Sequence, residues 1–243
     1  MTPPDSRRLP HGIRREVVSF ARRDGRVRPH IAKAWGAEHE DWMVHPVRCD
    51  RDASLDPAWK VDQQEIFGRR APLVVEIGSG TGDAVLAAAQ AHPDIDHLAV
   101  EVYRPGAATT VIRAHRGGLT NLRVLPADAA ELLRTALADG QVQEVRIFFP
   151  DPWPKARHHK RRLVNDDTIT QVVRVLAPGG ILRLATDWAD YADQMLTVTE
   201  SCAQLTNPYG GFAPRWEGRP QTKFERKGLA AGRTSFDLEL RRL

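Results

Sequence analysis

The 243-residue chain has little cysteine and no long apolar segment. Its two cysteines, Cys49 and Cys202, form no Cys-x-x-Cys pair and join no Cys/His cluster with ligand spacing, which argues against disulfides and structural zinc. No apolar run approaches the ~18 residues of a membrane span, and mean hydropathy is -0.42. The arginine-containing N-terminus lacks the apolar stretch of a signal peptide. We therefore expect a cytoplasmic protein, a monomer or homodimer, with no membrane association and no metal.

Positive charge is small in total but uneven along the chain. Lys and Arg number 35 against 31 Asp and Glu, a net charge of +4. Residues 1–33 carry nine basic and three acidic side chains, and residues 151–165 carry five basic and one acidic. We expect residues 1–60 to form a basic, flexible N-terminal arm with one short helix over residues 15–23. Residues 61–243 are expected to form the folded domain.

From residue 73 onwards, apolar strands alternate with helical segments. The expected strands are 73–77, 97–102, 121–125, 145–149 and 181–186, and the expected helices are 83–91, 105–115, 129–137, 166–176 and 190–202, with Asp166 or Asp167 as the cap of the fourth helix. This alternation predicts right-handed βαβ crossovers and an α/β fold with a doubly wound, mostly parallel sheet. Residues 235–240 alternate apolar and polar side chains, which predicts an antiparallel C-terminal edge strand.

Acidic residues stand at or just after the end of each of the five expected parallel strands. They are Glu76, Glu101, Asp128, Asp151 and Asp187. In an open parallel sheet, ligands bind outside the carboxyl ends of the strands, near the point where the strand order reverses. Five carboxylates at that edge therefore predict a binding site.

A glycine-rich turn joins the first strand to the first helix. Its glycines are Gly78, Gly80 and Gly82. The nicotinamide fingerprint requires a glycine where this chain has Asp83, and Glu76 would repel a pyrophosphate, so a nicotinamide oxidoreductase is disfavoured. Glu76 suits a ligand with an ammonium group, Glu101 can accept hydrogen bonds from ribose hydroxyls, and Asp128 can accept one from an adenine amino group. Amine, ribose and adenine together describe S-adenosylmethionine.

The fourth strand runs into Phe-Phe-Pro-Asp-Pro-Trp-Pro, residues 148–154. Prolines on both sides leave the carboxylate of Asp151 little backbone freedom. The next turn carries Lys155, Arg157, His158, His159, Lys160, Arg161 and Arg162. Arg and Lys at this density suit the phosphates of a polyanion. Adjacent histidines without a carboxylate or cysteine partner do not predict a metal site.

Together these motifs resemble the bacterial tRNA (guanine-N7-)-methyltransferase family, which has the Rossmann-like fold of class I S-adenosylmethionine-dependent methyltransferases. The resemblance rests on E-I-G-x-G-x-G at 76–82, F-F-P-D-P-W at 148–153, K-x-R-H-x-K-R-R at 155–162, A-T-D-W at 185–188 and T-K-F-E at 222–225. It covers roughly residues 73–240. The S-F-A-R-R segment at 19–23 is similar to the family's variable N-terminal part, whereas residues 36–60 match no part of the family pattern.

The resemblance implies methyl transfer from S-adenosylmethionine to N7 of a guanosine in the variable-loop region of tRNA. By position, it implies cofactor binding by Glu76, Gly78, Gly80, Gly82, Glu101, Asp128 and Asp151, with Asp151 also the active-site acid. Lys155, Asp187, Thr222, Lys223, Phe224 and Glu225 would hold the guanosine. Arg157, His158, His159, Lys160, Arg161 and Arg162 would contact the RNA.

Two other functions remain open from the sequence. A methyltransferase of another substrate class would keep the glycine turn and Glu101 but would leave residues 155–162 unexplained. A non-catalytic RNA-binding module would keep those basic residues beside a vestigial pocket.

Overall fold

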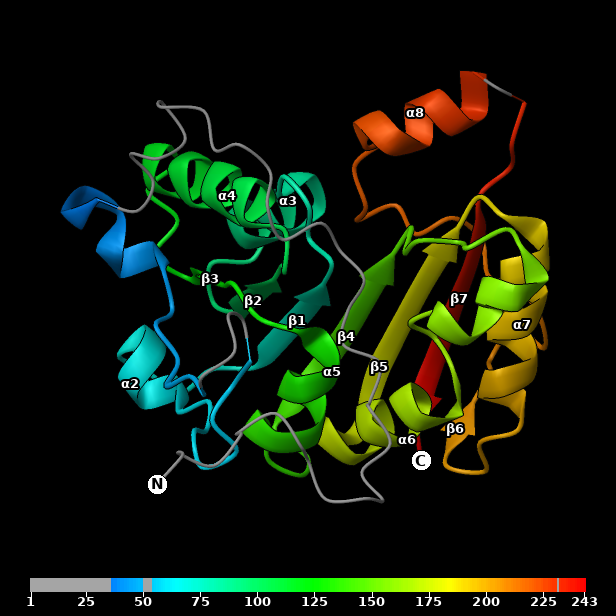
Figure 1. The fold of residues 1–243 in the computed structure, drawn as a ribbon, viewed down its shortest axis with the longest axis horizontal. Coiled ribbons are helices and arrows are strands. Elements are labelled where there is room, and N and C mark those ends of the chain that lie inside the picture. Colours follow the sequence, from blue (N-terminus) through cyan, green and yellow to red (C-terminus); the bar gives the residue numbers. More distant parts are fainter. Residues whose placement is uncertain (1–35, 50–53, 231) are drawn as a thin grey trace, which may run out of the picture.

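A seven-stranded sheet runs through the part of the chain that the computed structural model describes, residues 36–49, 54–230 and 232–243 (Figure 1). The helix expected over residues 15–23 and the rest of the basic arm up to residue 35 lie outside the described residues. The strands are β1 (Leu73–Ile77), β2 (Asp96–Val100), β3 (Leu122–Leu125), β4 (Val142–Phe148), β5 (Leu176–Thr186), β6 (Leu205–Thr206) and β7 (Phe236–Arg242).

The strand order is β3-β2-β1-β4-β5-β7-β6. Strands β1 to β5 are parallel, and β7 is antiparallel to β5. The predicted α/β fold with a doubly wound, mostly parallel sheet is confirmed. Because the chain moves outward from β1 to β3 and then returns to the other side of β1 as β4, the strand order reverses between β1 and β4. Sheets of this kind bind ligands at that point, beyond the carboxyl ends of the strands.

Helices cover both faces of the sheet. They are α2 (Gln63–Phe67), α3 (Asp83–Ala91), α4 (Arg104–Arg116), α5 (Ala129–Glu131), α6 (Asp166–Val175), α7 (Ala189–Glu200) and α8 (Lys223–Ala230), with shorter turns η2 (Ala37–Trp42), η3 (Leu132–Ala136) and η4 (Ala156–Arg161). Side chains of α3 and α4 pack on one face, and those of η3, α6 and α7 pack on the other. None of the helices in the described ranges is long and apolar enough to cross a bilayer.

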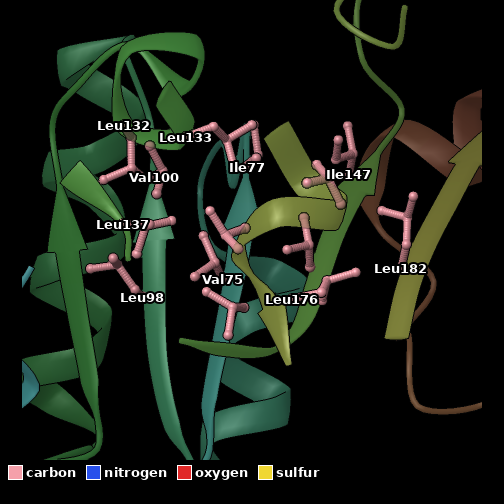
Figure 2. Close-up of a cluster of buried hydrophobic side chains, with 14 of the residues drawn as sticks. Val75, Ile77, Leu98, Val100, Leu132, Leu133, Leu137, Ile147, Leu176 and Leu182 are labelled. Atoms are coloured by element: carbon pink, nitrogen blue, oxygen red, sulfur yellow. The ribbon is translucent and has the colours of Figure 1, made fainter. Parts of the chain in front are cut away.

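The larger apolar cluster fixes the carboxyl ends of the central strands. In Figure 2, Leu132, Leu133 and Leu137 lie against the strand residues Ile77 and Val100. Burial of one such side chain contributes about 1.5–3 kcal/mol relative to its exposure. The residues that follow these strands therefore start from rigid positions.

Three local features differ from the sequence-based expectation. The fourth predicted helix is capped by Asn165, whose side chain accepts from the backbone N–H of Thr168 at 3.0 Å. Asp166 and Asp167 lie in the first turn instead, where they complement the helix dipole. The helix expected over 129–137 divides into α5 and the π-helical turn η3. Residues 178–180 lie inside β5, which begins earlier than expected and shifts register against β4.

The antiparallel strand near the C-terminus occurs as expected, as β7. The two-residue strand β6 adds a further antiparallel pairing on its outer side. The unpaired edge of β7 is thereby shortened, which limits pairing with another chain.

Residues 36–49 and 54–60, which the sequence analysis assigns to the flexible arm, pack on the sheet. The indole of Trp42 donates to the carbonyl of Leu119 at 2.9 Å. The backbone N–H of Val44 donates to the carbonyl of Val124 in β3 at 2.9 Å, so this segment covers the β3 edge. Leu55 is buried, and its N–H donates to Glu131 at 3.0 Å.

Candidate active site

Two neighbouring cavities lie where the strand order reverses, at the carboxyl ends of the strands. The larger has a volume of about 600 Å³, and Glu101, Asp128 and Asp151 line it. The smaller has a volume of about 360 Å³, and Glu76 lines it together with the glycine turn. Gly78, Phe148 and Phe149 border both cavities. Four of the five predicted strand-end acids are thus brought to one site.

The glycine turn has a backbone that other residues rarely adopt. The φ angles of Gly78, Gly80 and Gly82 are 72°, 57° and 82°. At Gly82 a side chain would also collide, since a Cβ there would lie 2.6 Å from the Thr110 methyl group of α4. The turn therefore brings α3 close to α4 and leaves backbone facing the smaller cavity.

Glu76 is a buried carboxylate in β1, beside Arg146 of β4 in the sheet register. Burial raises the pKa of Glu76 to about 7, and the positive charge of Arg146 opposes this shift. Within the described ranges its Oε2 has no hydrogen-bond partner. A buried carboxyl group with an unused oxygen, at the edge of a cavity, fits a cationic ligand.

Glu101 follows β2 and is held by two backbone donors. The N–H of Gly80 donates to Oε2 at 2.7 Å, and the N–H of Tyr103 donates to Oε1 at 2.7 Å. Burial raises the pKa of Glu101 above its usual value, while these hydrogen bonds oppose the shift. The glycine turn thus fixes the orientation of the carboxylate without placing a countercharge on it.

Asp128 follows β3 and caps α5. Its Oδ1 accepts from the backbone N–H of Ala130 at 2.9 Å. The side chain is buried and lines the larger cavity. Capping α5 therefore fixes the orientation of the Asp128 side chain. The sequence predicts that this residue accepts a hydrogen bond from adenine.

Asp151 is exposed and stands in a loop with two unusual backbone conformations. Phe149 and Trp153 have φ angles of 51° and 45°, in the left-handed region that non-glycine residues avoid. Each such conformation costs about 1–3 kcal/mol and persists only where the surrounding structure holds it. Strain on both sides of a carboxylate that lines the cavity marks this loop as functional.

The basic turn after this loop is η4. Lys155, Arg157 and Lys160 are exposed. The Arg161 guanidinium lies 5.0 Å from the Trp153 ring centre, and both residues line the larger cavity. Arg162 differs from its neighbours, because it is buried. His158 and His159 are half-buried. Among the described residues, no group of three or more His, Cys, Asp or Glu side chains is arranged to hold a metal ion.

The residues predicted to hold guanosine do not all line the two cavities. Thr222 lines the smaller cavity. Asp187 lines neither cavity and accepts from the Arg233 Nε at 2.7 Å. Lys155 is exposed at the start of η4. Lys223 and Phe224 are the first two residues of α8, which Figure 1 shows beyond the carboxyl ends of β4 and β5.

Glu225 is buried in an ion-pair network that the sequence did not reveal. Arg215 donates to both its oxygens, at 2.8 and 3.0 Å, and Arg219 donates to Oε1 at 3.1 Å. Burial opposes its ionisation, yet these hydrogen bonds hold the pKa of Glu225 below its usual value. Arg219 also pairs with Asp237 of β7. Its guanidinium lies 5.1 Å from the ring centre of Phe148, which lines both cavities.

Comparisons with known proteins show the family of the chain. A family described as "Putative methyltransferase" matches residues 70–238. A tRNA (guanine-N(7)-)-methyltransferase of Cutibacterium acnes is 45% identical over 235 residues, which cover 95% of this chain and 85% of that protein. One of a Nocardioides species is 46% identical, covering 98% of this chain and 90% of that protein. The chain belongs to the tRNA (guanine-N7-)-methyltransferase family.

Solved structures support the fold alone. The 16S rRNA methyltransferase KamB superimposes with a TM-score of 0.57 at 17% identity, covering 82% of this chain and 99% of that one. In this member of the methyltransferase family, all the predicted cofactor residues except Gly82 line two neighbouring cavities. It leaves Asp187 and Glu225, predicted guanosine contacts, paired with arginines.

Proposed function

We propose that this protein transfers a methyl group from S-adenosylmethionine to N7 of a guanosine in the variable-loop region of tRNA. One observation carries the proposal: four strand-end acids line two neighbouring cavities beside a basic turn, in a chain of this family. A methyltransferase of another substrate class leaves the basic turn unexplained, and a non-catalytic RNA-binding module gives the acids at the cavities no use.

The residues present fit S-adenosylmethionine. The unused oxygen of Glu76 and its pKa of about 7 suit an ammonium group, which would draw the carboxyl group into its ionised form. Glu101 would accept from ribose hydroxyls and Asp128 from the adenine amino group. The backbone of Gly78 and Gly80 would lie beside the cofactor, and Gly82 would contribute by letting the turn pack against α4. When bound, the cofactor supplies a methyl group on a positively charged sulfur.

The acceptor atom determines what the protein must do. Guanine N7 carries a lone pair and no proton, so its methylation requires no general base. The base becomes cationic as the new bond forms. Asp151, exposed in its restrained loop, would stabilise this developing charge and help to align the two reactants.

Recognition of the base requires acceptors for the guanine N1–H and N2–H₂ groups. Asp187 is the better placed of the two predicted acids, because its partner Arg233 is partly exposed and can be displaced by the base. Glu225 is buried with Arg215 and Arg219 and would act by shaping the T-K-F-E segment. Lys155, Thr222, Lys223 and Phe224 complete the proposed guanosine contacts.

The basic turn would bind the RNA backbone outside the cavity. A tRNA guanosine engaged in tertiary contacts must be extracted, at a cost of ~a few kcal/mol, and cationic contacts to phosphates offset that cost. The exposed Arg157 and Lys160 suit this role, with Arg161 and the histidines beside them. A tRNA substrate fits a protein that works in the cytoplasm, and we propose that it acts there as a monomer or homodimer.

Nucleoside analysis tests the proposal. The protein is incubated with S-adenosylmethionine and an unmodified tRNA transcript, and the digested RNA is examined by mass spectrometry. We expect 7-methylguanosine, at a variable-loop position once the product is mapped. A different methylated atom would support another substrate class, and tRNA binding without methylation would support a binding module. Either result would overturn the proposal.

A further inference from the structure

We propose that Arg162 is a positioning residue for Asp151. This inference rests on the proposed function, because it gives Arg162 a part in the turnover of the same site. The sequence pattern groups Arg162 with the RNA contacts, at the end of the basic run. The structure gives its guanidinium partners that all lie within the protein.

Arg162 has almost no surface to offer to a phosphate, since it is only 2% exposed. Its Nε donates to the carbonyl of Pro152 at 2.9 Å, and Nη1 donates to the side-chain oxygen of Gln194 at 2.7 Å. Nη2 donates to a carboxylate oxygen of Asp190 and contacts His159 at 3.1 Å. Every nitrogen of the guanidinium is therefore engaged.

The carbonyl that Arg162 binds belongs to the residue directly after Asp151. On the other side of Asp151, the backbone N–H of Phe149 donates to the carbonyl of Ala185 in β5 at 2.7 Å. The prolines at 150 and 152 fix φ on either side of the acid. Two hydrogen bonds to the loop backbone, one of them from the Arg162 side chain, and two proline rings thus restrain the position of Asp151.

The next residue along the loop shows why the second hydrogen bond is needed. Trp153 has a φ of 45°, which a non-glycine residue keeps only when its surroundings hold it. The Pro152 carbonyl that accepts from Arg162 belongs to the peptide bond between Pro152 and Trp153. Release of this carbonyl would let Trp153 relax and would move the loop that carries Asp151.

The other partners of Arg162 give it a rigid base in α7. Its guanidinium lies 4.8 Å from the ring centre of Tyr191, which is buried in the core. The Tyr191 hydroxyl accepts from the N–H of Val164 at 2.9 Å, and Gln194 donates to the carbonyl of Val164 at 3.1 Å. The loop is thus tied through Arg162 to a helix that packs on the sheet.

Substitution by lysine separates positioning from RNA binding. Lysine keeps the positive charge that a phosphate contact needs, but one ammonium group cannot bind the carbonyl, the amide and the carboxylate in one plane. An RNA contact would therefore survive in Arg162→Lys, whereas the hold on the Pro152 carbonyl would not.

The experiment measures kcat, the KM for tRNA, the Kd for S-adenosylmethionine and hydrogen exchange of residues 148–155. We expect Arg162→Lys to lower kcat by on the order of 10- to 100-fold, to leave KM and Kd near wild type, and to speed exchange in this loop. Arg174→Lys is the matched control, because Arg174 also binds a loop carbonyl, that of Leu137 at 3.0 Å, but lines neither cavity. It should leave kcat and loop exchange unchanged. A wild-type kcat in Arg162→Lys, or a raised KM alone, would overturn the inference.

A second variant covers the case in which Arg162→Lys does not fold. Asp190→Ala removes an exposed carboxylate that holds Arg162. Loss of a negative charge near the RNA should tighten tRNA binding, so a reduced kcat in this variant would support positioning and an unchanged one would contradict it. If the wild type makes no 7-methylguanosine, the proposed function fails. Hydrogen exchange of residues 148–155 still tests the role of Arg162 in that case. Exchange at the wild-type rate in Arg162→Lys would show that Arg162 does not restrain the loop. Where Arg162→Lys does not fold, the same result in Asp190→Ala would show it.

Discussion

The two halves of the strand-end edge hold their carboxylates in different ways. At β2, Glu101 accepts from backbone N–H groups, and Glu76 in β1 has an oxygen without a hydrogen-bond partner among the described residues. At the ends of β5 and β7 and in α8, the acids are paired with arginines, as in Asp187 with Arg233 and Glu225 with Arg219.

This difference separates acids suited to ligand binding from acids that stabilise the protein structure. The backbone donors to Glu101 orient its carboxylate without neutralising its negative charge. An arginine neutralises the charge, and in a buried pair neither partner can be removed without leaving the other uncompensated. The first half is therefore suited to hold the cofactor, and the second half stabilises the loops that form the other side of the site.

The largest expected effect lies at the boundary between the halves, at Asp151. Asp151→Ala should lower methyl transfer by at least on the order of 100-fold, because developing charge on the base loses its stabilising carboxylate. The affinity for S-adenosylmethionine should fall much less, as measured by titration calorimetry. Asp166→Ala, which removes an exposed acid of α6, is the control. An active Asp151→Ala enzyme would remove Asp151 from the mechanism.

Removal of a buried arginine should break the second half. Arg219→Ala leaves Asp237 and Glu225 without their shared partner, and we expect a loss of about 3–5 kcal/mol in the free energy of unfolding. Urea denaturation measures this loss. Arg241→Ala removes an exposed pair with Glu239 and should cost no more than ~1 kcal/mol. Equal losses in the two variants would show that the Arg219 network is not a buried structural unit.

The pKa of Glu76 sharpens the comparison through pH. It lies at about 7, above the usual glutamate value of 4.5, because the group is buried. This group therefore stabilises the ligand-free protein fully below about pH 4.5, and that contribution is lost as the pH rises through 7. Glu76→Gln should therefore be more stable than wild type at pH 8, by up to ~3 kcal/mol.

The affinity for S-adenosylmethionine should show the opposite dependence. Wild-type affinity should rise from pH 6 to pH 8 as Glu76 ionises, by up to about tenfold per pH unit below the pKa. Glu76→Gln should bind more weakly, with a flatter profile. The titration of the ligand itself is common to both proteins and cancels in the comparison. Parallel profiles would contradict a direct role for Glu76.

The smallest effects are expected at the basic turn. Arg157→Ala and Lys160→Ala should each reduce the slope of log affinity for tRNA against log salt by about 0.7–0.9, the value for one phosphate contact. Filter binding at several salt concentrations measures this slope, and cofactor affinity should stay unchanged. A slope equal to that of the wild type would place the RNA elsewhere on the protein.

The first half of the site could be predicted from the sequence because its interactions are local or follow a regular pattern. The β1 strand and α3 have the predicted bounds, and the glycine turn between them has the positive φ angles that its residues favour. Acids at strand ends follow from the alternation of strands and helices. Their convergence needs only the sheet topology.

The arginine partners could not be predicted because they lie far away in the sequence. Arg233 and Asp187 are 46 positions apart, and Arg162 reaches Asp190 across 28. A basic run gives the sign of its charges but not the direction of each side chain. The sequence therefore groups Arg162 with the RNA contacts, and only the structure shows that its guanidinium binds residues of α7.

A tRNA in which 7-deazaguanosine replaces guanosine tests the central claim most directly. This base keeps the shape and the N1–H and N2–H₂ donors of guanine but has a C–H group in place of the N7 lone pair. With labelled S-adenosylmethionine, we predict that ordinary tRNA becomes methylated, whereas the substituted tRNA binds with similar affinity and accepts no label. Label incorporated equally into both RNAs would show that N7 is not the acceptor and would contradict the account.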